Sequence, residues 1–443
     1  MNKRHQYSVI VVGGGISGTA LAFTLARYTN IESIALFEKY DELASLNSNA
    51  KGNSQTIHAG DIETNYTYEK AKKVRDIAAM VANYAHEFGY TDKHILKGTK
   101  MAIGVGETEV EFIKNRYNQF KEIYPYLEFW TKEDLATIEP KLVEGREEDI
   151  VAMGVKDHYT TMDFGAISKT FIENGKKAND NLDSYLGESV EEITRKGDKF
   201  IVRTSKETYY ADYVVVDAGA HSLLFAHQMG YGKDLSCLPV GGSFYFAKEK
   251  LLTSKVYTVQ NPKLPFAAVH GDPDMDRNGD LRFGPTAIVL PKLERYHHAH
   301  FIEFMEALEP DRHVLKVFMD LLKDSDIRDF VFKNFLFDIP GIRTKLFVHE
   351  VQKIIPTIKA EDLEFAEGIG GLRPQVIDKK NEKLMLGEAS IDTKEGIVFN
   401  MTPSPGATTC LGNALTDAKK ACEYLGAKFD DKLFDKEIRK PQK

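Results

Sequence analysis

Cysteine is scarce in this chain. Cys237, Cys410 and Cys422 are the only three, and they form no close pair and no C-x-x-C motif. This usage argues against a disulfide framework, a zinc site and an iron–sulfur cluster, because each of them needs cysteines that come together. It is typical of a protein that works in a reducing compartment.

Positive charge and long apolar runs are lacking as well. The 58 Lys and Arg residues are outnumbered by 66 Asp and Glu residues, so the formal net charge is −8. This balance argues against nucleic acid as a partner, since phosphate binding needs a cationic surface. No segment approaches the ~18 apolar residues that cross a bilayer. The apolar run 9–12 ends at three glycines and does not resemble an export signal, so we expect a protein that is soluble or at most peripheral to a membrane.

The chain begins with a strand, a glycine-rich turn, a helix and a second strand. Residues 7–12 predict a buried strand, residues 17–27 a helix and residues 33–37 the second strand. Glu38 follows directly, twenty residues beyond Gly18, where a carboxylate can accept hydrogen bonds from ribose hydroxyls. This order predicts a dinucleotide-binding site rather than a purely structural glycine turn.

The turn has the spacing G-x-G-x-x-G. Gly13 permits a tight bend, Gly15 lets the backbone approach a pyrophosphate, and Gly18 lets the helix pack closely on the strand. The free N–H groups and the partial positive charge at the start of the helix favour a phosphate there. Only one such motif is visible, whereas enzymes that exchange electrons with a soluble nicotinamide usually need a second nucleotide site.

Later segments return to the same kind of structure. Residues 200–204 and 208–211 predict hairpin strands, and residues 213–217 predict a buried strand that ends at a turn of small residues. Residues 396–400 are strand-like, and a loop and a helix through about Leu425 follow them. Parallel strands deliver backbone groups to a ligand at their carboxyl ends. The nucleotide-binding part is therefore predicted to be discontinuous. The inserted part includes residues 244–349, with a long helical stretch at 300–323.

Several motifs resemble those of known flavoproteins. Residues 52–60, G-N-S-Q-T-I-H-A-G, resemble the second flavin-contacting segment of the D-amino-acid oxidase-like superfamily, in which the L-2-hydroxyglutarate dehydrogenases carry a very similar run. Four further motifs are similar to those of the malate:quinone oxidoreductases: E-T-N-Y-T at 63–67, P-V-G-G at 239–242, F-G-P at 283–285 and S-P-G-A at 404–407. The resemblance covers most of the chain, from Val9 to about Ala421.

The resemblance implies an α/β fold with a discontinuous, FAD-binding Rossmann-like domain of the glutathione-reductase type and an inserted α+β substrate domain. The FAD-binding domain would comprise residues 1–90, 146–236 and 355–425. The substrate or capping domain would comprise residues 91–145 and 237–354, and residues 426–443 would form a C-terminal tail.

The function that the resemblance implies is FAD-dependent oxidation of (S)-malate to oxaloacetate, with electrons passed to a membrane quinone. The protein would be cytoplasmic and peripherally associated with the inner face of the cytoplasmic membrane. A related dehydrogenase or oxidase for L-2-hydroxyglutarate or L-lactate, with quinone or oxygen as acceptor, is the nearest alternative. A flavoprotein that binds its cofactor without redox chemistry is a hypothesis of another class, and a nicotinamide-binding protein agrees with the first motif alone.

The resemblance and the glycine motif together assign sixteen residues to FAD. They lie in the first turn and after the second strand, in the second flavin-contacting segment, and in three later turns. They are Gly13, Gly15, Ile16, Ser17, Gly18, Glu38, Lys39, Asn53, Ser54, Gln55, Val190, Ala218, Gly219, Pro405, Gly406 and Ala407.

Oxidation of a hydroxy acid needs a base for the hydroxyl proton. His270 is the first candidate, because an apolar approach leads to it, Asp272 lies two residues on, and the imidazole titrates near neutrality. A loop histidine that pairs with a backbone carbonyl is the alternative interpretation. His58, in the flavin-contacting segment, is the second candidate for the base, although a structural contact with the flavin is the favoured interpretation.

The substrate carboxylates need cations. Arg373 follows the run G-I-G-G-L and precedes Pro374, a constrained turn that would hold a guanidinium fork for bidentate carboxylate binding. A surface arginine on a turn is the alternative. A dicarboxylate needs a second cation, for which the sequence offers Arg343, Lys345 and His349.

Two other features have simple explanations. The histidine run at 297–300 lacks a carboxylate or cysteine context, so no metal site is expected. The aromatic and aliphatic patch at 330–339 could dock on a bilayer interface, but the sequence favours an internal core helix.

Overall fold

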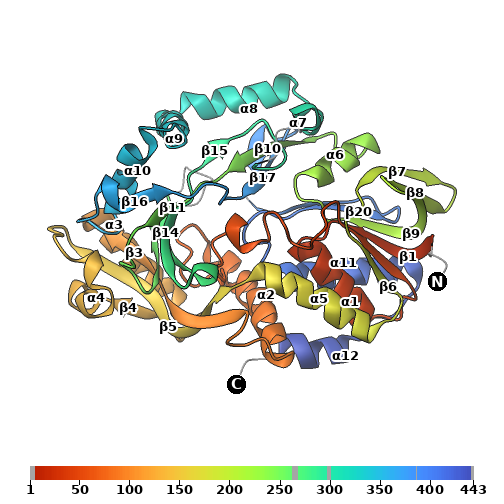
Figure 1. Ribbon diagram of the computed structural model, residues 1–443, viewed down its shortest axis with the longest axis horizontal. Coiled ribbons are helices and arrows are strands. Elements are labelled where there is room, and N and C mark those ends of the chain that lie inside the picture. The colour runs from red at the N-terminus through yellow and green to blue at the C-terminus, as the bar shows by residue number, and fades with distance from the viewer. Residues whose placement is uncertain (1–4, 262–267, 297–300, 386, 441–443) are drawn as a thin grey trace.

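Helices and three β-sheets make up the part of the chain that this computed structural model describes, residues 5–261, 268–296, 301–385 and 387–440 (Figure 1). The histidine run at 297–300 lies outside the described residues. No helix within the described ranges is both long enough and apolar enough to cross a bilayer.

The N-terminal strand lies in the middle of a mostly parallel sheet. In spatial order the strands are β19 (Ala389–Asp392), β20 (Ile397–Met401), β9 (Thr208–Val216), β1 (Gln6–Val12), β2 (Ile34–Phe37) and β6 (Leu182–Tyr185). Only β19 runs antiparallel to its neighbour in this series. The strands β7 (Val190–Lys196) and β8 (Lys199–Thr204) extend the sheet from β9. Since β1 has strands on both sides and packed layers on both faces, its sequence is continuously apolar from Val9 to Val12.

One face of this sheet is covered by helices. They are α1 (Ile16–Tyr28), α5 (Phe164–Ala178) and α11 (Cys410–Leu425), with α2 (Tyr68–Glu87) packed beyond α11. Phe23 of α1 is central to this layer, because its ring stacks on Phe171 of α5 at 5.5 Å and meets Tyr84 of α2 edge-on at 5.2 Å. The helix α6 (His221–Gln228) and a second, small sheet cover the opposite face.

The small sheet consists of β15 (Ile288–Val289), β10 (Leu235–Gly241), β17 (Leu372–Asp378) and β18 (Lys383–Met385) in that order. Its central strands β10 and β17 are antiparallel, and Val240 lies opposite Arg373. Leu238, Leu372 and Val376 belong to the same apolar core as the parallel sheet. The small sheet therefore holds Arg373 in a fixed position next to the carboxyl ends of the parallel strands.

The third sheet forms the other half of the molecule. Its strands, in spatial order, are β16 (Leu363–Phe365), β11 (Tyr245–Ala247), β14 (Asp280–Gly284), β13 (His270–Asp274), β12 (Lys255–Thr258), β3 (Ile95–Val105), β5 (Ile150–Met162) and β4 (Glu128–Trp130). The helices α3 (Glu107–Phe120), α4 (Lys132–Ile138) and α10 (Arg343–Gln352) lie around it. The strand β5 belongs to this sheet, although the expected division of the chain assigned residues 150–162 to the nucleotide-binding part.

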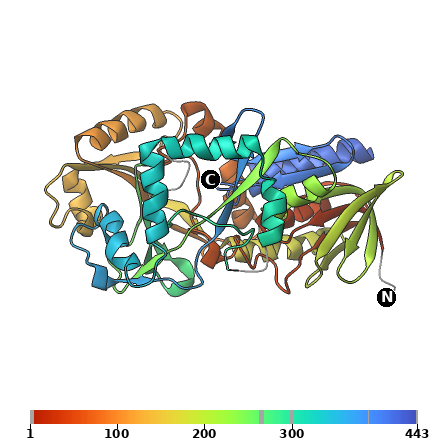
Figure 2. The ribbon, with the colours of Figure 1, turned by 90° about the horizontal axis from the view of Figure 1, so that it is seen from above.

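Three further helices cross from one half to the other. They are α7 (Phe301–Leu308), α8 (Arg312–Lys323) and α9 (Ser325–Leu336), and Figure 2 shows α8 and α9 running in different directions on the face toward the viewer. A short last helix, α12 (Asp431–Phe434), packs near α1.

Most expected elements agree with the structure to within two residues, but two do not. The predicted strands at 208–211 and 213–217 form one continuous strand, β9, because Asp212 stays within the ladder. The expected single helix at 300–323 is wrong: it is divided into α7 and α8. Pro310 interrupts it, and the Asp311 side chain accepts hydrogen bonds from the backbone of His313 and Val314, which begins a new helix.

Candidate functional site

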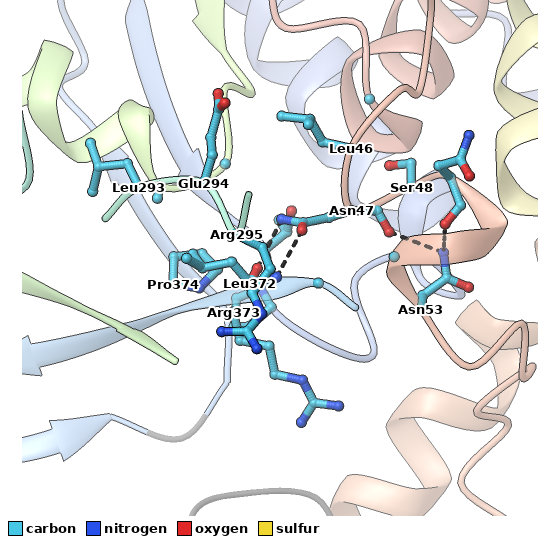
Figure 3. A pocket seen from close by; sticks show the side chains of 18 of the residues that line it. Leu46, Asn47, Ser48, Asn53, Leu293, Glu294, Arg295, Leu372, Arg373 and Pro374 are labelled. Atoms are coloured by element: carbon cyan, nitrogen blue, oxygen red, sulfur yellow. Dashed lines mark hydrogen bonds between the residues drawn. The ribbon is translucent and has the colours of Figure 1, made fainter. Parts of the chain in front are cut away.

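A cavity of about 1040 Å³ lies where the three sheets meet. It is lined by Gly13 at the end of β1, by Arg373 of β17 and by His270 of β13, one residue from each sheet. In Figure 3 the segments Leu293 to Arg295 and Leu372 to Pro374 lie on one side of it, and Ser48 and Asn53 lie on the other. Its volume is at the upper end for small-molecule sites and suits a dinucleotide with a substrate.

The glycine-rich turn has the tight backbone that its sequence predicts. Gly13 has a φ of +114°, and a Cβ there would lie 2.4 Å from the carbonyl oxygen of Asp217. A Cβ on Gly18 would lie 2.0 Å from the Gly13 carbonyl oxygen. Both positions therefore need glycine, and they leave the backbone of Gly15 and the start of α1 exposed to the cavity.

Glu38 is held at the cavity wall by the backbone. Its Oε2 accepts a hydrogen bond from Gly14 N at 2.8 Å, and its Oε1 accepts one from Tyr40 N at 2.9 Å. Burial raises the pKa of Glu38, and these backbone hydrogen bonds counteract it. Each carboxylate oxygen keeps a further lone pair, so Glu38 can still accept ribose hydroxyls.

Thirteen of the sixteen expected cofactor residues line the cavity; Gly18, Gln55 and Gly406 do not. Gly18 lies inside the contact between α1 and the turn. Gln55 points away, because its amide binds Asp274 Oδ1 at 3.1 Å and the backbone N–H of Met275 at 2.8 Å. Gly406 lies in a turn where a Cβ would meet the carbonyl oxygen of Thr402 at 2.5 Å.

Two wall segments, residues 44–49 and 293–296, were not predicted from the sequence. Ser48 Oγ accepts a hydrogen bond from Ile16 N at 2.9 Å, at the start of α1. Asn47 joins the two sides of the cavity, since its amide exchanges hydrogen bonds of 2.8 and 2.9 Å with the backbone of Leu372. The run S-L-N-S-N at 45–49 is rich in short polar side chains, which is the signal that could have marked this segment.

His270 is the first residue of β13 and is buried. Its Nδ1 lies 2.5 Å from Asp272 Oδ2, and among the described residues neither atom has another polar partner. The ring of Tyr257 stacks on it at a centroid distance of 4.4 Å. Burial lowers the pKa of His270 and outweighs the opposing effect of Asp272, which favours the neutral imidazole. With Nδ1 facing the carboxylate, its Nε2 is the atom left to accept a proton.

Asp272 belongs to a buried cluster of charged side chains. Lys255 Nζ lies 3.5 Å from Asp272 Oδ1 and donates a 3.0 Å hydrogen bond to the carbonyl oxygen of Ser54. Arg282 pairs with Asp274 at 3.1 Å and donates to the carbonyl oxygen of Asn53 at 2.7 Å. These contacts tie the third sheet to the cavity segment at residues 50–55.

His58 also lines the cavity, with its own carboxylate partner. Its Nδ1 lies 3.0 Å from Glu63 Oε1, and its backbone N–H donates to Thr408 Oγ1 at 3.1 Å. Next to this pair, the buried Lys100 binds Asp61 at 2.7 Å and the carbonyl oxygen of Ile57 at 2.9 Å.

Arg373 projects into the cavity from β17. Among the described residues its side chain has no hydrogen bond and no ion pair, and burial lowers its pKa, with the hydroxyls of Tyr66 and Tyr257 near enough to oppose that shift. A guanidinium without a partner in a cavity is an anion-binding group.

The three cations considered for a second carboxylate lie elsewhere. Arg343, Lys345 and His349 are all on α10, and none of them lines the cavity. Arg343 instead lies over the ring of Phe365 at 3.7 Å.

The patch at 330–339 is only partly internal. Phe337 is buried, whereas the side chains of Phe332 and Phe335 are 65% and 54% exposed. The expectation of a core helix is therefore wrong for these two residues, because α9 turns them away from the core that holds Phe337.

A family model described as malate:quinone oxidoreductase (Mqo) matches residues 5–433. A probable malate:quinone oxidoreductase of Campylobacter jejuni is 52% identical over 98% of this chain and 100% of the relative. A malate:quinone oxidoreductase of Helicobacter pylori is 46% identical over 98% of each chain. An L-2-hydroxyglutarate dehydrogenase of Caenorhabditis briggsae is 28% identical over 92% of each chain.

Two solved structures with the same fold are oxidases. L-α-glycerophosphate oxidase of Mycoplasma pneumoniae, with FAD bound, has a TM-score of 0.68 at 19% identity and covers 96% of each chain. Glycine oxidase of Geobacillus kaustophilus has a TM-score of 0.65 at 16% identity and covers 95% of each chain. The mixed α/β fold of this chain is thus shared with these oxidases.

Proposed function

The chain belongs to the malate:quinone oxidoreductase family, and from this premise we propose how the residues of its cavity carry out the reaction. The activity is the oxidation of malate to oxaloacetate with a quinone as acceptor. The observation that best supports the proposed roles is the placement of Arg373, without a partner, in the same cavity as His270 with its carboxylate.

The cofactor of the proposal is FAD. The turn at Gly13 and the start of α1 would hold the pyrophosphate, and Glu38 would bind a ribose. The fit rests on the backbone, since a Cβ at Gly13 or Gly18 would collide with neighbouring carbonyl oxygens. When bound, FAD accepts the two electrons and the hydrogen that leave C2 of the substrate.

The fold supports a finer description. The parallel sheet would be a Rossmann-like FAD-binding domain of the glutathione-reductase type, and the third sheet would belong to an inserted substrate domain. The division at residues 1–90, 146–236 and 355–425 against 91–145 and 237–354 remains our proposal, with two strands transferred to the substrate side: β5, which pairs with β3 and β4, and β16, which pairs with β11.

His270 is the base of the proposal. Its Nε2 accepts the proton of the C2 hydroxyl, and Asp272 holds the ring in the orientation and tautomer that this needs. The buried position of the pair excludes water and favours the neutral imidazole before the substrate binds.

Arg373 binds a substrate carboxylate. The guanidinium fork can donate two parallel hydrogen bonds, and this fixes C2 relative to both FAD and His270. Because β17 is a central strand of its sheet, the arginine starts from a rigid element.

The quinone acceptor implies that the protein binds to a membrane surface. We define the apolar ridge as the exposed side chains of Leu315, Met319 and Leu322 on α8 and of Phe332 and Phe335 on α9. Quinones dissolve in the bilayer, and an exposed apolar ridge of this kind lets a protein lie in the interface. The protein would thus bind peripherally to the inner face of the cytoplasmic membrane.

Anaerobic addition of L-malate to the purified protein tests the function. Bleaching of the visible flavin band, reversed by a soluble quinone analogue, is the expected result. Bleaching by L-2-hydroxyglutarate or L-lactate but not by malate would replace the substrate and keep the fold. Rapid peroxide formation in air without added acceptor would identify an oxidase, and a protein that binds no FAD would refute the proposal.

A further inference from the structure

The strand β12 lies beside the strand that carries His270, and it supports both members of the base pair. Tyr257 stands directly opposite His270 in the antiparallel ladder of β12 and β13. Because directly opposed residues point to the same face of a sheet, the two rings stack, with a centroid distance of 4.4 Å and an interplanar angle of 27°. Lys255, two residues earlier, shares this face, and its Nζ lies 3.5 Å from Asp272 Oδ1.

The same two side chains of β12 also reach the cavity segment at residues 53–56. The Tyr257 hydroxyl donates to Thr56 Oγ1 at 2.7 Å, and Lys255 Nζ donates to the carbonyl oxygen of Ser54 at 3.0 Å. Ser54 and Thr56 both line the cavity, in the segment that contains residues expected to contact FAD. The strand β12 thus connects the base with that segment.

The hydroxyl of Tyr257 is fixed as a donor. Burial raises its pKa and the charge of Asp272 raises it further, so the hydroxyl keeps its proton. Thr56 Oγ1 donates its own hydrogen to the carbonyl oxygen of Ser54 at 3.1 Å, which leaves a lone pair for Tyr257. The tyrosine ring is therefore anchored at its hydroxyl end, while its face carries the imidazole.

A contact on its face is what the imidazole of His270 still needs. Its Nδ1 is held by Asp272 at 2.5 Å, but a ring held at one atom can tilt about that contact, and Nε2 moves with it. The stacked ring of Tyr257 opposes this tilt. An edge-on contact with His58 at 6.1 Å holds the tyrosine ring in turn. Proton transfer is sensitive to such displacements, because a shift of about 1 Å can cost about 100-fold in rate.

We propose that Tyr257 is a positioning residue for malate oxidation, which fixes the plane of the His270 ring and ties it to the segment at residues 53–56. The inference rests on the proposed function, in which His270 Nε2 accepts the proton of the C2 hydroxyl. Tyr257 is not among the residues that line the cavity, so it acts through His270 and not on the substrate.

The charged groups around His270 determine how its pKa responds to a loss of Tyr257. Burial is the main cause of the lowered pKa; Asp272 on the same strand raises the pKa, and Lys255 on β12 and His58 lower it. The Tyr257 ring provides part of the burial, so a smaller side chain admits water and raises the pKa of His270. A base works in its neutral form, so the pH at which reduction by malate becomes half-maximal rises with that pKa.

Rapid-mixing reduction by malate, measured over a range of pH, tests the proposal. Tyr257→Leu removes the aromatic face and should slow the limiting rate about 100-fold or more, with the pH midpoint moved upward. Tyr257→Phe keeps the face and loses only the hydrogen bond to Thr56, so its limiting rate should stay within about tenfold of the wild type, with an unchanged midpoint. The Kd for malate should change less than about threefold in both variants.

Tyr245→Leu is the matched control in the same sheet. Tyr245, on β11, stacks on Phe347 at 4.2 Å and donates its hydroxyl to the carbonyl oxygen of Phe337 at 2.5 Å, away from the cavity lining. Its replacement should lower stability, as Tyr257→Leu does, and leave the limiting rate and the pH midpoint unchanged.

Three outcomes would overturn the positioning role. The first is a wild-type limiting rate in Tyr257→Leu, and the second is an equal loss of rate in Tyr245→Leu. The third is a weaker Kd for malate at an unchanged limiting rate, which would make Tyr257 a substrate-binding residue.

Nitrogen-15 NMR of the histidine-labelled resting holoprotein gives a readout that does not depend on turnover. The signals that disappear in His270→Gln should titrate below the ordinary pKa of histidine in the wild type and in Tyr257→Phe, and closer to it in Tyr257→Leu. An unchanged midpoint in Tyr257→Leu would overturn the proposal. A wild type that malate does not reduce would instead refute the proposed function, while the titration still tests Tyr257, so the two failures are distinguishable.

Discussion

Arg373 is identified as a binding group because its side chain lacks the contacts that other buried arginines make. Buried and half-buried arginines elsewhere in the chain are engaged, as Arg282 is with Asp274 and Arg146 is with the backbone carbonyl of Leu142. Arg373 has no such partner among the described residues. A group that gives up hydrogen bonds in the free protein gains them when a carboxylate arrives.

Replacement of Arg373 by Lys should therefore lower kcat/KM for malate about 30- to 1000-fold. The reason is the loss of the bidentate fork at a desolvated site, which costs about 2–4 kcal/mol. Steady-state kinetics with a soluble quinone measure it. Arg343→Lys, which alters an arginine outside the cavity, is the control. An Arg373→Lys enzyme with wild-type kcat/KM would contradict the proposed role.

At Asp217, burial affects the pH dependence of stability. Asn400 donates to Asp217 Oδ1 at 3.1 Å and to Asp417 Oδ2 at 2.6 Å, so two carboxyl groups share one amide. Burial and the charge of Asp417 raise the pKa of Asp217 from 3.8 to about 7. Between these values the native protein holds a proton that the unfolded chain has lost, and its free energy of unfolding falls as pH rises.

Asp217→Asn should remove that dependence. The stability of the variant relative to the wild type should increase as pH rises from about 4 to about 7 and then level off, with a total on the order of a few kcal/mol. Urea unfolding over this pH range, followed by circular dichroism, measures the difference. A constant difference at every pH would show that Asp217 does not titrate as described.

At the scale of elements, local signals predicted the parts that lie close together in sequence. β1, the glycine turn and α1 are contiguous, so spacing alone predicted the tight backbone at Gly13 and Gly18 and the position of Glu38 directly after β2. The signals for the division of 300–323 were also local, since Pro310 and Asp311 stand at the break, yet the apolar periodicity on both sides suggested one helix.

Other parts could not be predicted because they depend on strands that are distant in sequence. Nothing near Lys255 or Arg282 in the sequence predicts that both are buried and bind the carbonyl oxygens of Ser54 and Asn53. For the same reason sequence suggested cations on α10 for a second carboxylate, whereas that helix packs away from the cavity.

The apolar ridge of α8 and α9 gives a prediction at this scale. Leu315→Ser together with Phe332→Ser should weaken binding to phospholipid vesicles by about tenfold per side chain, because each loses more than about 1 kcal/mol of apolar burial. Co-sedimentation measures it, with Tyr210→Ser, an exposed site on β9, as control. If the double variant sediments with the vesicles as the wild type does, the ridge is not the membrane-binding surface. The same conclusion follows if light scattering shows that the substitutions change only the size of the oligomer.

At the scale of the whole molecule, the cavity connects all three sheets. Its walls come from the parallel sheet, from the small sheet that carries Arg373 and from the third sheet that carries His270. A ligand that fills it contacts both halves of the protein, so its binding energy contributes to holding them together.

Removal of the FAD that we propose as cofactor should therefore destabilise the protein as a whole. At free FAD about 100-fold above Kd, the holoprotein should gain about 2.7 kcal/mol over the apoprotein, or a rise in Tm of about 3 °C for a chain of 443 residues. Differential scanning fluorimetry with increasing FAD measures it, and Gly18→Ala, which places a Cβ against the Gly13 carbonyl oxygen, should abolish the rise. If Tm still rises with FAD in this variant, FAD binding does not depend on the glycine turn.

The order of strands in the parallel sheet also sets when the site can exist during synthesis. β1 leaves the ribosome first, but its neighbour β9 begins at Thr208 and the next strand, β20, begins only at Ile397. The loop after β20 contributes Pro405 and Ala407 to the cavity wall. At about 5–20 residues per second, translation reaches this loop about 20–80 s after β1 is made. The nascent chain must keep the strongly apolar strand β1 from aggregating throughout that interval, and the cavity is complete only after this loop has been made.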